Sequence, residues 1–147
     1  KQKLKAAATE VRESVYEGDE TAIKAVLDKS WVYMQRAHLH ASGLGNTALA
    51  LTLVVALLGT SPAVLRVISL ALGVGGFGYS VYWLWAGFRA PGLGSTAAAK
   101  ESLKWLAMPS SGAVVVATAV VAGLLAMAII RRRTPNQTGE IKPPNIV

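Results

Sequence analysis

Two histidines are the residues of this chain best suited to chemistry, and they stand together as His38-Leu39-His40 at the entry to a long apolar stretch. Ionisable side chains at membrane depth are costly and often functional. Residues i and i+2 of an α-helix point about 200° apart, so one ion cannot easily bind both rings from one helix. A site here would use one histidine together with a group from elsewhere.

Four interpretations of the histidine pair stay open. A haem b could take His40 as an axial ligand, since Gly43 and Gly45 leave room for the macrocycle. Copper could bind His38 together with Met34, which lies one helical turn earlier on the same face. A quinone-type ligand or a lipid could accept a hydrogen bond from either ring. In the fourth interpretation, the histidines lie at the membrane surface and bond only water, headgroups or neighbouring backbone.

The rest of the chain offers no catalytic constellation. It contains no cysteine, which excludes disulfides, thiolate metal sites, iron–sulfur clusters and cysteine nucleophiles. All 8 carboxylates lie outside the long apolar stretches. Proton-coupled transport needs buried titratable groups, so this distribution argues against a pump or transporter. We therefore expect no enzymatic activity from the isolated chain.

Composition places the chain in the membrane class. Hydrophobic residues make up 52% of its 147 residues and charged residues only 16%, which excludes intrinsic disorder. The net charge of +7 would suggest nucleic-acid binding in a soluble protein. Here the basic residues flank apolar blocks, so we expect anionic lipid headgroups as the partner and no nucleic acid.

Three apolar stretches are long enough to cross a bilayer, which takes roughly 20 helical residues. They cover residues 37–58, 63–88 and 110–130. The turn at residues 59–62 predicts that the first two form an antiparallel hairpin, with Pro62 at the first helical position. The sequence therefore predicts an all-α integral membrane protein with three transmembrane helices.

The flanking segments are predicted from local signals. Residues 1–36 form an amphipathic N-terminal region of one or two helices, with a break at Gly18 and an N-cap at Asp19. Residues 89–109 form a helical loop, in which Ser95 or Thr96 caps a short helix over residues 97–108. Pro109 ends or kinks that helix, or begins the third span. Residues 131–147 form a polar, extended tail.

Small residues on the second and third spans predict helix packing. Pairs of small residues four positions apart allow helices to approach closely in a membrane. The candidate packing residues are Ser69, Gly73, Gly75, Gly76, Ser80, Ala119 and Gly123. The neighbour is either another helix of this chain, another membrane subunit, or a second copy in a homo-oligomer.

Aromatic residues cluster on the side of the membrane that carries the N-terminus, as interfacial Trp and Tyr do. Positive charges are balanced between the two sides and leave the orientation open. We expect the bacterial inner membrane as the location, with an organellar membrane as the other option. An initiator Met is normally removed only when a small residue follows it, and Lys1 is not small, so we expect that Lys1 is not the native start.

These features favour a small non-catalytic integral-membrane subunit that scaffolds or stabilises a larger membrane complex. The histidine pair is the reason to consider a respiratory or other electron-transfer assembly. One alternative is a haem- or copper-binding redox subunit that uses His38 or His40. A second alternative is a small homo-oligomeric channel, for which the spans offer few polar side chains.

Overall fold

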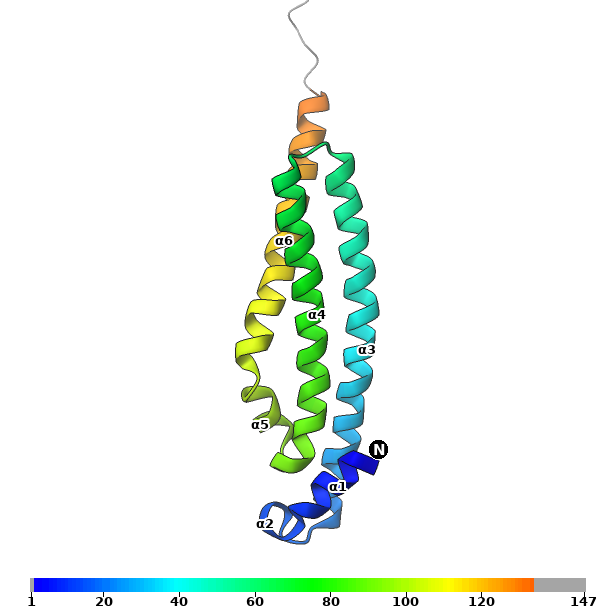
Figure 1. The fold of residues 1–147 in the computed structure, drawn as a ribbon, viewed down its shortest axis with the longest axis vertical. Helices are drawn as coiled ribbons and strands as arrows, with labels where there is room; N and C mark the ends of the chain where they lie inside the picture. Colours follow the sequence, from blue (N-terminus) through cyan, green and yellow to red (C-terminus); the bar gives the residue numbers. More distant parts are fainter. Residues whose placement is uncertain (1, 134–147) are drawn as a thin grey trace, which may run out of the picture.

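The computed structural model describes residues 2–133, and within that range every regular element is an α-helix (Figure 1). Three of these helices are long and apolar enough to cross a membrane. They are α3 (Glu20–Leu57), α4 (Pro62–Leu93) and α6 (Lys104–Arg133). The predicted all-helical fold with three such helices is therefore confirmed at the level of length and composition.

Three short helices gather at one end of this bundle (Figure 1). They are α1 (Gln2–Glu10), α2 (Arg12–Tyr16) and α5 (Thr96–Glu101). The turn between α3 and α4 lies at the other end, as does the C-terminal end of α6. The predicted tail at residues 131–147 lies outside the described residues from residue 134 onward, and residues 131–133 continue α6.

Helix α3 joins the predicted second amphipathic helix to the first predicted span without a break. Its 38 residues correspond to about 57 Å at 1.5 Å per residue. Asp19 caps it as predicted, and its carboxylate accepts hydrogen bonds from the backbone N–H groups of Thr21 and Ala22. The predicted boundary at residue 36 is a change in hydropathy and not a helix end, because no proline interrupts the segment.

The single helix predicted over residues 1–18 is divided at Val11, where φ is −107° and ψ is 15°. The break allows Ala8 and Tyr16 to pack in one buried cluster with Ile23. On an unbroken helix, Ala8 and Tyr16 would lie about 12 Å apart along the axis. Gly18 then reverses the chain with a φ of 77°.

The predicted end of the second span at residue 88 is wrong, because α4 continues through Pro91 to Leu93, into the segment predicted as the loop over residues 89–109. A proline inside a helix removes one hydrogen bond. Ala86 and Ala90 are fully buried on the same side of this last turn, and their packing holds the turn in place. The helix ends at Gly94, whose φ of 63° only glycine adopts at little cost.

The predicted helix over residues 97–108 is also corrected. Ser95 caps α5 as expected, since its hydroxyl accepts a 3.2 Å hydrogen bond from the N–H of Ala98. The break falls at residues 102–103 and not at Pro109, which lies inside α6. Leu103 is only 1% exposed, and burying its side chain against α3 and α4 fixes where the chain turns.

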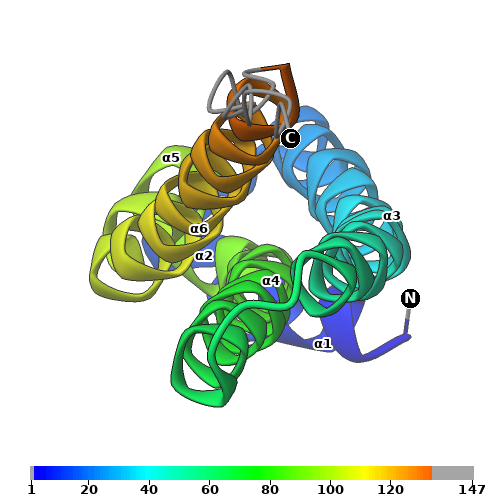
Figure 2. The same ribbon diagram turned by 90° about the horizontal axis from the view of Figure 1, so that it is seen from above.

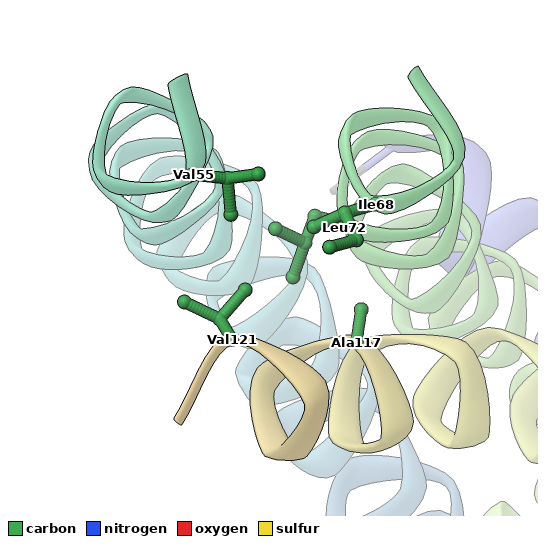
Figure 3. Close-up of a cluster of buried hydrophobic side chains, with 5 residues drawn as sticks. All are labelled: Val55, Ile68, Leu72, Ala117 and Val121. Carbon is green, nitrogen blue, oxygen red and sulfur yellow. The ribbon is translucent and has the colours of Figure 1, made fainter. Parts of the chain in front are cut away.

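Helix α4 is the centre of the bundle, with α3 and α6 packed on two of its sides (Figure 2). Near the end with the α3–α4 turn, apolar side chains from all three helices meet in one buried cluster (Figure 3). Its members are Val55, Ile68, Leu72, Ala117 and Val121. Along most of their length, α3 and α6 contact α4 and not each other.

Candidate functional site

An aromatic cluster joins α3 to α4 at the end of the bundle that carries the short helices. Its members are Tyr33 and His40 from α3 and Tyr79, Tyr82 and Trp83 from α4. Positions 33 and 40 are seven apart, and 79, 82 and 83 are three and four apart, so each set shares one helical face. The ring centroids of Tyr33 and Trp83 lie 5.0 Å apart in an edge-to-face arrangement, which is a favoured geometry for aromatic pairs.

His40 belongs to this aromatic cluster. Its half-buried ring lies 5.1 Å from the ring of Tyr79 and 6.0 Å from that of Trp83, nearly parallel to the latter. These contacts orient the imidazole through helix packing. The ring is thus held in place by side chains of its own chain.

His38 and Met34 lie in different surroundings. The His38 side chain is exposed, whereas Met34 is half-buried and faces α4. A Cβ atom placed on Gly87 would lie 3.2 Å from Cγ of Met34. Between residues 2 and 133, no three His, Cys, Asp or Glu side chains gather as a metal site.

Two basic side chains flank the aromatic cluster from different elements. The guanidinium carbon of Arg36 lies 5.1 Å from the Trp83 ring centroid and 5.8 Å from that of Tyr33. Nζ of Lys100, on α5, lies 6.0 Å from the same Tyr33 ring. These distances are within the range of cation–π attraction. We call Arg36 and Lys100 the cationic pair.

Some charged and polar groups of this region have partners and others do not. Within residues 2–133, no carboxylate pairs with either member of the cationic pair, while the neighbouring Lys104 and Glu101 pair at 2.5 Å. The indole Nε1–H of Trp83 is buried and has no hydrogen-bond partner among the described residues. A buried donor without an acceptor costs about 1–3 kcal/mol. The region therefore combines positive charge with an unused donor.

The glycines of α4 serve two different neighbours. A Cβ on Gly75 would lie 2.8 Å from the carbonyl oxygen of Ser110 on α6. A Cβ on Gly76 would lie 3.2 Å from Cβ of Leu44 on α3. Ser80 is buried as well, and its hydroxyl donates a 2.8 Å hydrogen bond to the carbonyl of Gly76. These three candidate packing residues lie between helices of the same chain.

The other candidate packing residues do not lie buried between helices of this chain. Ser69 is half-buried, and its hydroxyl donates a hydrogen bond to the backbone of its own helix. Gly73, Ala119 and Gly123 are exposed, and a Cβ on either glycine would meet nothing within 4 Å. The internal packing of the described chain does not require small residues at these exposed positions.

Besides the Tyr and Trp side chains of the aromatic cluster, three contributors to this region were absent from the sequence-based candidates. Arg36 and Lys100 are separated by 63 intervening residues, and only the register of α3 and α5 brings both to Tyr33. Gly87 is the third, since a Cβ there would lie 2.9 Å from the carbonyl oxygen of Ser30. The available signal was the position of Arg36, three residues after Tyr33 and immediately before the first predicted span.

Comparisons of the chain with protein families, with curated proteins and with solved structures find no match. Its function must therefore be inferred from the contacts, burial and charge of its own residues.

Proposed function

We propose that this chain is a small non-catalytic integral-membrane subunit that scaffolds or stabilises a larger membrane complex, such as a respiratory or other electron-transfer assembly. The observation that carries the proposal is the uneven coverage of the three long helices. We compared the most apolar 18-residue segment of each helix. The buried share of that segment is 28% in α4, 6% in α3 and 11% in α6. Helix α4 is packed by its own chain, whereas α3 and α6 offer wide apolar faces to other molecules.

The type of residue on these open faces favours protein partners over lipid alone. Ala119 and Gly123 lie four positions apart on α6, and both are exposed. A second small surface lies between α3 and α4, where Gly45 and Gly73 line a shallow groove of about 200 Å³. Small residues let another helix approach closely, and the resulting van der Waals packing drives helix association in membranes.

The placement of acidic groups supports a non-catalytic role. Every Asp and Glu side chain between residues 2 and 133 is exposed and lies in or beside the segments at the α1–α5 end. A buried carboxylate with a raised pKa is a common sign of acid–base catalysis in membrane proteins. The described residues provide packing surfaces and none of these groups.

Purification from native membranes tests the proposal. An affinity-tagged full chain, extracted in a mild detergent, should co-purify with other integral membrane proteins in fixed stoichiometry. A Gly123→Leu variant should lose those partners and keep the helical content and melting temperature of the free chain. A chain that purifies alone, with no partner detected by mass spectrometry, would contradict the proposal.

A matched control separates loss of partners from general damage to α6. Val116 is 63% exposed and already large, so Val116→Leu adds one methylene group without filling a small-residue surface. We expect this variant to keep its partners. Equal losses in Val116→Leu and Gly123→Leu would mean that the small surface on α6 has no special role.

A further inference from the structure

We propose that Arg36 and Lys100 bind the phosphate of an anionic phospholipid headgroup at the membrane surface on the α1–α5 side. This inference rests on the membrane location proposed above and is independent of any partner subunit. The ligand class follows from the two donors present, because a guanidinium and an ammonium both bind oxyanions.

Geometry brings the two basic groups to the same aromatic ring. Both lie within 6.0 Å of the Tyr33 ring centroid, although one comes from α3 and the other from α5. Tyr33 itself is only 7% exposed, so the surrounding side chains hold its ring in a fixed position. The guanidinium carbon of Arg36 lies 5.8 Å from the Tyr33 ring centroid and 5.1 Å from that of Trp83, and a guanidinium can donate two parallel N–H bonds to a phosphate.

The charge around the cationic pair stays positive. Glu101 is the neighbouring acidic residue on α5, and it is already paired with Lys104 at 2.5 Å. Asp28 is on α3 like Arg36, but it lies about 12 Å away along the helix axis. Two cations near one ring, with no carboxylate paired to either among residues 2–133, attract an anion to this part of the surface.

Depth favours a lipid as the source of the phosphate. Arg36 immediately precedes the stretch of residues 37–58, which contains no Asp, Glu, Lys or Arg, so it lies at the expected level of the headgroups. Trp85 and Trp105 pack edge to face on α4 and α6, with exposed fractions of 45% and 64%. Exposed tryptophans of this kind are typical of the membrane–water interface.

Fluorescence quenching by brominated lipids tests the site directly. A chain with Trp31, Trp85 and Trp105 replaced by Phe keeps Trp83 as its single reporter beneath Arg36. The quenching of Trp83 fluorescence is measured in phosphatidylcholine vesicles that contain a brominated lipid. Brominated phosphatidylglycerol should quench Trp83 at a lower concentration than brominated phosphatidylcholine does. Two basic groups, each worth roughly fivefold in attraction to anionic lipid, predict a preference of about 25-fold.

In the same single-Trp chain, the double variant Arg36→Gln/Lys100→Gln should bring this preference close to one. The control variant Lys24→Gln/Arg66→Gln removes the same charge from exposed positions far from the site and should retain most of the preference. Equal preferences in the two double variants would overturn the proposal. If the Arg36→Gln/Lys100→Gln chain does not fold, the preference of the parent chain in 1 M salt serves instead, and it must fall strongly.

Two further arms separate the explanations for failure. Inorganic phosphate at 20 mM should leave the lipid preference unchanged. If the lipid preference disappears when phosphate is added, the site binds free phosphate and not lipid. Resistance of the chain to carbonate extraction from the vesicles reports membrane insertion separately. An inserted chain without lipid preference overturns the lipid site alone, while an extractable chain overturns the membrane location.

Discussion

The hydroxyl of Tyr16 donates a 2.7 Å hydrogen bond to the carbonyl oxygen of Pro91 and so ties α2 to the last turn of α4. The last four carbonyls of a helix have no donor within that helix. Pro91 is in this last turn, so the tyrosine supplies a bond that the helix itself cannot. Tyr16 is only 5% exposed, and its ring packs in the cluster that holds α1 and α2 on α3.

Replacing Tyr16 with Phe should loosen the N-terminal helices without unfolding the bundle. The variant keeps the ring but removes a hydrogen bond of about 1 kcal/mol. Hydrogen–deuterium exchange of the α1 and α2 amides should become about fivefold faster. Thr9→Val is the control, because the Thr9 hydroxyl bonds only to its own helix. Unchanged exchange in Tyr16→Phe would contradict an anchoring role.

The same contact predicts an alkaline transition. Burial raises the pKa of Tyr16 above its ordinary value of 10.0. The stabilisation by the neutral hydroxyl is therefore complete below pH 10.0 and is lost as the pH rises through the higher, folded-state pKa. Exchange of the α1 and α2 amides, corrected for intrinsic rates, should accelerate in that range. The Tyr16→Phe variant should lack this transition, and an identical alkaline profile would show that another group is responsible.

Gly75 and Gly73 should respond differently to the same substitution. In Gly75→Ala, the new methyl group meets the Ser110 carbonyl at 2.8 Å, and such overpacking costs roughly 1–3 kcal/mol. The melting temperature in detergent, followed by circular dichroism, should fall. Gly73→Ala meets open space and should leave the melting temperature unchanged or raise it.

A bulkier Gly76→Leu should separate α4 from Leu44 on α3 while membrane insertion persists.

The two histidines should differ in their effect on stability. His40→Ala removes the ring packed against Tyr79 and Trp83, which should cost about 0.5–1.5 kcal/mol. His38→Ala removes an exposed ring and should cost little. We expect the visible spectrum and copper content of the double variant to equal those of the unmodified chain. A band or metal lost only in the double variant would establish a haem or copper ligand instead.

Amine labelling with a membrane-impermeant reagent should separate the two ends of the bundle. Helices α1 and α5, which carry Lys3 and Lys100, lie at one end, and the C-terminal end of α6 lies at the other (Figure 1). Lys3 and Lys100 should therefore react from the same side of the membrane. Lys142, outside the described residues, should react from the opposite side. Labelling of all three from one side would contradict three complete crossings.

Features encoded by neighbouring residues were predictable from the sequence. The caps at Asp19 and Ser95 and the start of α4 at Pro62 were recognisable from residue type and position. The three apolar helices were recognisable because each has a long stretch without charge. The end of α4 and the start of α6 were not, since proline is a usual helix breaker, yet Pro91 and Pro109 both lie inside helices here.

The candidate site depends on register, which no local pattern contains. Gly73, Gly75 and Gly76 look alike in the sequence, yet they face open space, α6 and α3 respectively. Likewise, Arg36 reaches Trp83 only because α3 and α4 pair antiparallel at one particular offset. Composition placed basic and aromatic residues at the same membrane level. It did not identify which of them touch.

The unbroken length of α3 has a mechanical consequence. In the proposed membrane location, about 30 Å of hydrocarbon would cover only part of a helix of about 57 Å, and the rest of the helix would extend beyond the apolar layer. Its outer end is not free, because Arg12 on α2 pairs with Glu20 at 2.8 Å and Tyr16 joins α2 to α4. Helices α2, α3 and α4 are thus joined in pairs. An ion pair links α2 to α3, a hydrogen bond links α2 to α4, and α3 packs against α4. We therefore expect a force applied to α2 to be transmitted to both α3 and α4.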